Sequence, residues 1–398
     1  MIPSLPRELR ELILSYLTRE EYKQTVPCKD LLLCKSHLPV KEFIEFKALP
    51  LIKLSNIELE IFFIQNAIKN NLYLVNKLIV NFKVDPSARN NRAIIEASRN
   101  GHLEVVKRLL QDSRVDPSAD NNYALRIAAY NGHLEVMEIL LQDPSSASAE
   151  RRLALRPDSR VDPSAMNNTA ICCASQNGHT EVVKRLLKDS RVDPSDNKNN
   201  AIRWASSNGH KEIVEILLKD SRVNPSDMNN AAIRCASYRR HTKIVEILLK
   251  DSRVDPSDMN NAAICCASQN GHLKVVEILL KDSRVDPSTN YNYAIRIASE
   301  KGHLKVVKRL LKDSRVNPSD INNFAIRISS YNGHIKVVER LLKDPRVDPA
   351  DEDSGALRWA LMKNHSEVAK LFFKDPRVYS KGWVRMIIEE TQLKIEAL

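Results

Sequence analysis

The stretch from residue 260 to residue 287 reads NNAAICCASQNGHLKVVEILLKDSRVDP, and most of the chain consists of copies of it. Its Gly-His pair recurs at steps of 31 residues. The pairs begin at Gly101, Gly132, Gly178, Gly209, Gly271, Gly302 and Gly333. Arg240 and Asn364 stand before a histidine in the two places where the glycine is missing, and the step from Gly132 to Gly178 is longer by 15 residues. Self-similarity at such a period predicts stacked repeats.

Each copy is interpreted as two helices followed by a projecting turn. The Ala-Ile-x-x-Ala-Ser segment predicts a short helix, with the Asn and Ser before it as the helix start and a left-handed glycine as its end. In the second helix, expected over residues 273–281, Leu273, Val276, Leu279 and Leu280 form one apolar stripe. Proline fixes its own φ and keeps the preceding residue out of the helical region, so Val-Asp-Pro-Ser predicts an extended turn.

These features resemble the ankyrin repeat, because GHLKVVEILL is followed by a polar loop and a short Ala-Ser helix. The resemblance covers Ile61 to Val378 and implies an all-α solenoid of about ten stacked helix-turn-helix repeats. Two departures stand out: Tyr-Ala-Leu-Arg or Phe-Ala-Ile-Arg replaces the usual Thr-Pro-Leu-His, and the repeat is two residues shorter than the common length. With its Val-Asp-Pro-Ser turn, the variant is similar to repeats of amoebae and of the giant viruses that infect them.

Composition predicts a chain that packs a long core and stays inside the cell. The 398 residues are 43% hydrophobic and 28% charged, without the run of about 18 apolar residues that a membrane span needs. Pro3, Pro6 and nearby charges interrupt the start, where a secretory signal needs a continuous apolar segment. We therefore expect a reducing compartment, the cytoplasm or nucleus, or the host-cell cytoplasm if the protein is viral.

Residues 1–58 do not follow the repeat and predict a small helical module. LPRELRELILSYL, from residue 5 to residue 17, resembles the opening of an F-box, which docks on the Skp1 adaptor of a ubiquitin ligase. The resemblance implies adaptor-docking roles for Leu5, Pro6, Leu9, Ile13, Leu14 and Leu17. The continuation departs from the family, because Pro27 intrudes and a later tryptophan is absent. The alternative is a cap that shields the first repeat from water.

The repeats are expected over residues 59–378, with a degenerate first copy and a worn last one. An insertion at residues 144–158 is rich in Ser, Ala and Pro and predicts a projecting loop. It is either a contact or modification site, or a tolerated slippage of repeat copying. Residues 379–398 predict a closing helix.

The residue inventory argues against an enzyme, a cofactor site or a metal site. Nine of the ten histidines occupy the Gly-His position, which favours hydrogen bonding to an adjacent loop over a role as general base. Glycine-rich phosphate loops and hydrolase, metalloprotease and kinase signatures are all absent from the sequence. Cys173, Cys235 and Cys266 take a repeat position filled elsewhere by Ile or Trp, so they are expected to be small hydrophobic residues between repeats.

Arginines recur at one position of the first helix in most repeats, and this column of arginines can be interpreted in two ways. Its members are Arg126, Arg203, Arg234, Arg296, Arg327 and Arg358. With the net charge of +11 they could form a basic stripe for an acidic protein or nucleic acid. Loop carboxylates such as Asp227 and Asp258 are suited to pair with them instead, and aromatic content of only 5% argues against nucleic acid. We expect a structural role in holding the loops.

What remains is a surface for a partner protein. A variable repeat position that is expected to be exposed on the concave side contains Tyr130, Gln176, Ser207, Tyr238, Gln269, Glu300 and Tyr331. Two functions fit: a plain ankyrin scaffold that binds an unidentified protein in its concave groove, or a substrate adaptor whose first residues also recruit ubiquitin machinery.

Overall fold

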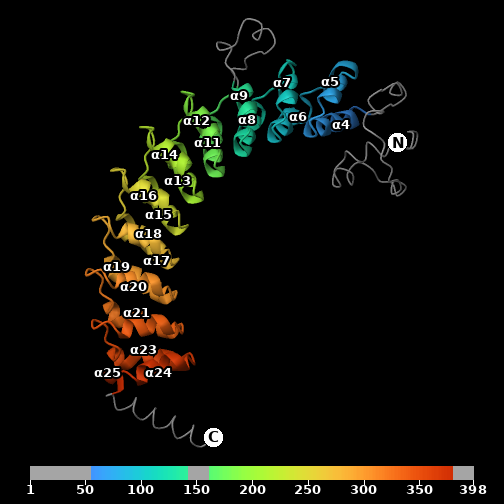
Figure 1. Cartoon of the computed structure of the whole chain (residues 1–398). Helices are drawn as coiled ribbons and strands as arrows, with labels where there is room; N and C mark the ends of the chain where they lie inside the picture. Colours follow the sequence, from blue (N-terminus) through green and yellow to red (C-terminus); the bar gives the residue numbers. More distant parts are fainter. Residues whose placement is uncertain (1–54, 142–160, 380–398) are drawn as a thin grey trace, which may run out of the picture. The chain divides into compact units, whose positions relative to one another are not determined.

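The structure is a computed structural model that describes residues 55–141 and 161–379. Within these ranges the chain forms 21 helices and no strand, and 20 of the helices make ten helix-turn-helix repeats (Figure 1). The predicted all-α repeat architecture is therefore confirmed.

The first helices share a position in the repeat and carry its Ala-Ile segment. They are α4 (Asn56–Ile68), α6 (Ala88–Arg99), α8 (Ala119–Asn131), α11 (Ala165–Asn177), α13 (Asp196–Asn208), α15 (Asp227–Tyr238), α17 (Asp258–Gln269), α19 (Thr289–Glu300), α21 (Asp320–Tyr331) and α23 (Asp351–Met362). The second helices follow each Gly-His pair or its replacement. They are α5 (Leu72–Asn81), α7 (Leu103–Leu110), α9 (Leu134–Leu140), α12 (Thr180–Leu187), α14 (Lys211–Leu218), α16 (Thr242–Leu249), α18 (Leu273–Leu279), α20 (Leu304–Leu310), α22 (Ile335–Leu342) and α24 (Ser366–Phe373), after which comes the short α25 (Pro376–Tyr379).

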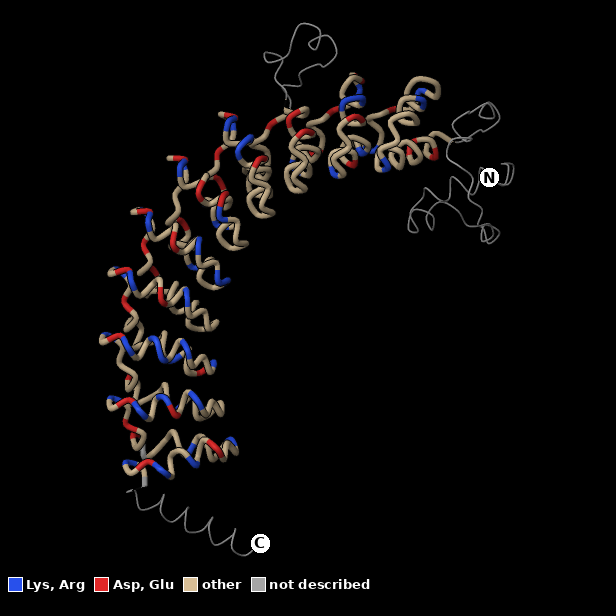
Figure 2. The backbone as a smooth tube through the Cα atoms, viewed as in Figure 1, with Lys and Arg blue, Asp and Glu red and all other residues tan. Residues whose placement is uncertain are grey.

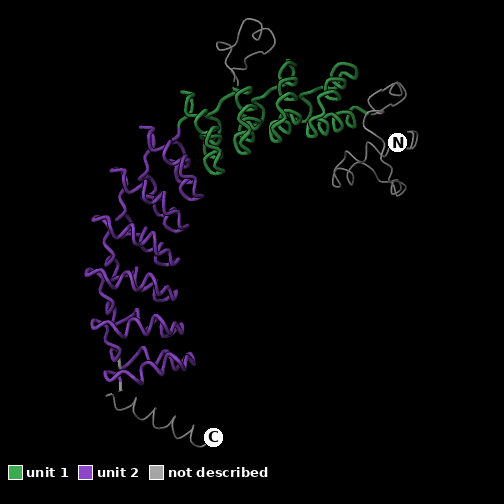
Figure 3. Tube along the Cα trace, in the orientation of Figure 1, with its two compact units in different colours: residues 1–193 green, residues 194–398 purple. Residues whose placement is uncertain are grey.

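The chain divides into two compact units, residues 1–193 and 194–398 (Figure 3). In each unit, every first helix packs against the first helix of the next repeat, and the second helices do the same. This nearest-neighbour packing is the pattern expected of a solenoid, in which a repeat buries its apolar faces against the repeats beside it.

The core of each repeat comes from both helices. In α17 and α18, Ile264, Val275, Val276 and Leu279 are completely buried, and each contributes roughly 1.5–3 kcal/mol through the apolar area that it removes from water. Leu273, which was expected in the stripe, is half-exposed, and the adjacent Val275 is buried in its place. The stripe therefore begins two residues later than the sequence pattern predicted.

The expected helix start is wrong in one respect. Within the assigned bounds of α17, Met259, Asn260 and Asn261 have φ of 51°, 57° and 58°, so a left-handed turn of three residues precedes the right-handed helix. Ser257 makes no helix cap, because its hydroxyl donates to the Asp255 carboxylate 2.6 Å away. The same three-residue turn occurs in α6, α8, α11, α13, α15, α19 and α21.

The expected glycine closure is confirmed. Gly271 has φ of 70°, and a Cβ on this residue would lie 2.7 Å from Nδ1 of His303 in the next repeat. Glycine is thus favoured both by backbone conformation and by close packing between repeats. Where glycine is missing, Arg240 and Asn364 adopt the same left-handed conformation, with φ of 67° and 58°.

The 15-residue insertion leaves the contact between its flanking repeats intact. The backbone N–H of Asp162 donates to Oδ1 of Asn122 at 2.9 Å, 40 residues away, whereas equivalent bonds elsewhere span 25 residues. Val161, the first described residue after the gap, is buried. The insertion itself, the closing-helix residues after Tyr379 and the F-box-like segment lie outside the described residues.

Candidate functional site

The predicted partner-binding residues lie at one place in the repeat, the last turn of the first helix. Tyr130 and Gln176 belong to unit 1. Ser207, Tyr238, Gln269, Glu300 and Tyr331 lie on five successive first helices of unit 2 (Figure 1). Because neighbouring first helices pack together, these residues lie along one face of each unit, which we call the first-helix face.

The side chains at this position differ in exposure. Tyr130 and Tyr238 are 44% and 50% exposed, and Gln269 is also exposed. Ser207 is only 8% exposed, contrary to the expectation, because its short side chain does not extend beyond its surroundings. Tyr238 and Gln269 therefore offer the most contact area within unit 2, and Ser207 offers little.

Histidines of the Gly-His pairs hold the backbone of this surface. Nε2 of His272 lies 2.9 Å from the Tyr238 carbonyl oxygen, and Nε2 of His303 lies 2.9 Å from that of Gln269. Equivalent contacts join His102, His133, His179, His241, His334 and His365 to the carbonyl 34 residues earlier, or 49 across the insertion. The expected hydrogen-bonding role is confirmed, but the acceptor is the end of the preceding first helix and not a loop.

A second set of bonds between repeats comes from buried asparagines. Oδ1 of Asn261 accepts from the backbone N–H of Asp286 in the next repeat at 2.8 Å, and Asn261 is 2% exposed. The equivalent residues Asn91, Asn122, Asn168, Asn199, Asn230, Asn292 and Asn323 make the same bond. Sequence analysis missed this function, although the recurring Asn-Asn pair carried the signal.

The first-helix arginines of α8, α13, α15, α19 and α21 donate to backbone carbonyls in the left-handed turns of their own repeats. Arg234 donates to the carbonyl oxygens of Asn229 and Met228 at 2.9 and 3.0 Å, and Arg296 makes the corresponding pair of bonds. This supports the structural interpretation of the column. The expected carboxylate partners are wrong, because Asp227 and Asp258 accept from the side-chain amides of Asn199 and Asn230 instead.

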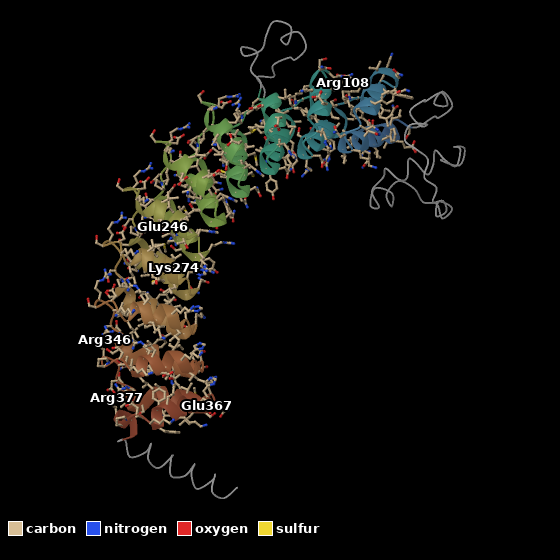
Figure 4. All side chains as sticks on the ribbon, in the orientation of Figure 1. Arg108, Glu246, Lys274, Arg346, Glu367 and Arg377 are labelled. Carbon is tan, nitrogen blue, oxygen red and sulfur yellow. The ribbon has the colours of Figure 1, made fainter. Side chains whose placement is uncertain are left out.

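A further arginine in the Asp-Ser-Arg turn, which sequence analysis overlooked, joins consecutive repeats. Arg253 binds both carboxylate oxygens of Asp251 at 2.9 and 2.6 Å, and it also donates to the carbonyls of Val223 and Leu218 in the preceding repeat at 2.8 and 2.9 Å. Arg346 and Arg377, both labelled in Figure 4, lie in the last repeats. They make the same four contacts. We call each such Asp-Arg pair with its carbonyl contacts a clasp.

Each clasp contributes one aspartate and one arginine to the charged residues that follow the second helices (Figure 2). Hydrogen bonding from Arg253 lowers the pKa of Asp251 below its ordinary value, and partial burial opposes this effect. The corresponding aspartates in the other clasps have pKa values lowered for the same reason. These carboxylates are therefore ionised near neutral pH and serve the framework.

Some exposed apolar side chains were not singled out from the sequence. Met166, Met228 and Met259 are 55%, 42% and 50% exposed in left-handed turns, and Trp204 is 39% exposed on α13. For the methionines the signal was an apolar residue where other repeats have Asn or Asp, whereas Trp204 occupies the position of Ile127 and Cys173. These residues add apolar contact area beside the first-helix face.

The cysteines among the described residues lie on first helices and are buried or half-buried. Cys173, Cys235 and Cys266 are half-buried, and burial raises the pKa of Cys266. Burial raises that of Cys265 to about 12, so its thiol is protonated at neutral pH. In the part of the chain that the structure describes, no three His, Cys, Asp or Glu residues are grouped to hold a metal ion. The same residues include no helix long and apolar enough to span a bilayer.

The repeated framework and the first-helix face of each unit define a helical repeat protein. The sequence matches the family described as "Ankyrin repeats (3 copies)" over residues 64–152, 151–229, 221–292 and 293–381. These matches cover most of the chain, which therefore belongs to the ankyrin repeat family.

Two further comparisons add little to this assignment. No curated protein matches the chain. Among the solved structures that match, an ankyrin repeat family protein from Legionella pneumophila is 15% identical, covers 94% of each chain and has a TM-score of 0.26. The family assignment therefore depends on the sequence match.

Proposed function

We propose that this ankyrin repeat protein is an interaction scaffold that binds a partner protein on its first-helix face. One observation carries the proposal: the recurring His, Asn and Arg side chains are bonded within the framework, while Tyr238 and Gln269, at a repeat position that varies in type, are exposed. The histidine bonds fix the backbone carbonyls of those same residues. Variable side chains on a fixed backbone suit selective recognition, because little ordering is needed on binding.

Catalysis is not part of the proposal. The histidines of the framework bond to backbone carbonyls, and the clasp carboxylates are bonded to arginines. Nothing among the described residues points to a reaction. The site of action that we propose is the cytoplasm or nucleus.

We further propose that residues 1–58 recruit a Skp1-like adaptor, so that the scaffold selects a substrate for a ubiquitin ligase. The support is sequence alone: Leu5, Pro6, Leu9, Ile13, Leu14 and Leu17 supply more apolar surface than one inward-facing cap requires. A scaffold without a ubiquitin link is the alternative, in which this segment only caps the first repeat.

Affinity capture with mass spectrometry tests both parts of the proposal. The baits are the wild-type chain, Tyr238→Ala with Gln269→Ala, and Leu9→Glu with Ile13→Glu. We expect the first pair of substitutions to remove the partner protein and the second pair to remove only the Skp1-like protein. Interface energy concentrates in a few anchors worth about 2 kcal/mol or more each, so two changes suffice.

The outcomes separate the two parts. A partner that the Tyr238 and Gln269 variant still retains would place binding elsewhere. If the wild-type bait captures no Skp1-like protein, the adaptor role is wrong and the scaffold without a ubiquitin link stands. Lys250→Ala with Lys281→Ala, at exposed positions after the second helices, is the matched control and should keep both partners.

A further inference from the structure

Three successive first helices of unit 2, α19, α21 and α23, share a cluster of aromatic and cationic side chains. Trp359 contacts Phe324 and Tyr331 edge-on, with ring centroids 6.3 and 5.6 Å apart. The guanidinium of Arg327 lies 4.7 Å from the centre of the Trp359 ring, and Nζ of Lys363 lies 4.5 Å from that of Tyr331. We call this group, together with Arg296, the aromatic-cation cluster.

The second halves of the three helices that form the cluster carry a net positive charge. The second halves of the three helices with the residue that follows each, 296–301, 327–332 and 358–363, contain the cations Arg296, Lys301, Arg327, Arg358 and Lys363. The one carboxylate in these segments, Glu300, forms an ion pair with Lys301 at 2.8 Å. Met362, 62% exposed, adds an apolar side chain at the edge. The local charge is therefore complementary to an acidic ligand with an apolar anchor.

The packing of the repeats does not require these aromatic side chains. At the repeat position of Phe324, two other repeats have Ala231 and Ala262, and at the position of Trp359 two have Ile297 and Ile328. Those repeats make the same bonds between neighbours. Trp, Tyr and Arg together are the residue types in which binding energy concentrates at protein interfaces.

We propose that the aromatic-cation cluster binds an acidic peptide segment of the partner protein, with carboxylates on the cations and an aliphatic or aromatic side chain against Met362 and the ring edges. This inference rests on the proposed scaffold function and specifies its partner. The cations hold the carboxylates beside an apolar surface, where charge-assisted hydrogen bonds are stronger than between fully solvated groups.

The ring geometry favours a peptide over a single-stranded nucleic acid. Bases bind such proteins by stacking on open aromatic faces. Here Arg327 lies over Trp359, Arg296 lies over Phe324 at 5.5 Å, and Lys363 lies over Tyr331. A cation thus occupies one face of each ring, while further ring contacts are edge-on. A base that stacks on one of these faces would have to displace its cation, whereas a carboxylate would bind the cation itself.

A display library of random 12-residue peptides, selected on the full chain, tests the proposal. The loss variant is Phe324→Ala with Trp359→Ile and Lys363→Asn, in which every new residue already occurs at the same repeat position elsewhere in the chain. The control is Tyr123→Ala, at the position of α8 that corresponds to Phe324. Lys363→Glu, a single exposed change, keeps the test valid if the loss variant melts at a lower temperature.

We expect selected peptides to be rich in Asp and Glu around one aliphatic or aromatic residue. They should bind the loss variant and Lys363→Glu about tenfold or more weakly, bind the control like wild type, and weaken as salt rises. Failure to enrich such a family, equal affinity for Lys363→Glu, or tighter binding of a 20-nucleotide oligothymidine would overturn the assignment. If the control loses peptide binding and the loss variant keeps it, the cluster is not the binding site, but the scaffold function stands.

Discussion

Buried asparagines determine how one repeat is attached to the next. Asn230 accepts the backbone N–H of Asp255 and donates to the Asp258 carboxylate at 2.8 and 2.9 Å. It does so from a left-handed conformation, which asparagine tolerates better than most residues. Leaving a buried N–H without an acceptor lowers the free energy of unfolding by about 1–3 kcal/mol. This small side chain therefore contributes substantially to stability.

The first prediction compares two neighbouring asparagines of α17. Asn261→Ala should lower the free energy of unfolding by about 1–3 kcal/mol more than Asn260→Ala, because only the first change leaves the Asp286 N–H without its acceptor. Both residues are left-handed, with φ of 58° and 57°, so the backbone strain of alanine is matched. Urea unfolding measures the difference, and equal losses would refute the role of the asparagine.

The second prediction concerns the Asp251–Arg253 clasp and pH. Because Arg253 lowers the pKa of Asp251 in the folded chain, the clasp stabilises fully above the ordinary aspartate pKa, about 3.9, and loses this contribution as pH falls through the lower folded value. Urea unfolding at pH 5, 4 and 3 should show a smaller acid-induced loss for Asp251→Asn than for wild type. Ser252→Ala, an exposed change in the same turn, should behave like wild type, and identical slopes for all three chains would contradict the account.

At the scale of the helix, the left-handed residue that ends α15 is an arginine instead of the usual glycine. Arg240 occupies the left-handed position with φ of 67°, which strains any residue that carries a Cβ. Arg240→Gly should therefore raise the free energy of unfolding by about 0.5–1 kcal/mol. This gain is the backbone strain relieved in the folded chain minus the entropy that glycine adds to the unfolded chain. Thermal unfolding measures this. Arg239→Gly, just before it and not at positive φ, is the control and should destabilise; a loss of stability in both variants would show that Arg240 makes compensating contacts.

The helices and their order could be predicted from sequence because the hydrophobic period and the Gly-His position recur in most copies. The turns could not, since Met259 and Asn260 give no local sign of a three-residue left-handed run. The clasps depend on contacts across about 30 residues, which only the folded stack brings together. Within the candidate site, the column of Tyr238 was found from sequence, whereas the cluster around Trp359 depends on side chains of three helices meeting in space.

At the scale of the molecule, a loss of stability in one repeat should affect mainly the repeats beside it. Leu248 is completely buried in α16, and Leu248→Ala should lower stability by about 2–5 kcal/mol. Because packing within each unit joins each repeat to the next, hydrogen exchange should increase first in α15–α18 and less toward α23. Lys250→Ala, exposed two residues later, is the control. Uniform loss of protection across unit 2 would contradict local coupling.

The central claim is that the first-helix face binds a partner protein while the histidines, asparagines and clasps only maintain the stack. Hydrogen exchange of the chain with and without its captured partner tests this claim most directly. The account predicts added protection at the ends of the first helices, around Tyr238, Gln269 and Tyr331, with little change in the second helices and Asp-Ser-Arg turns. Protection confined to the second helices or to the clasps would contradict it.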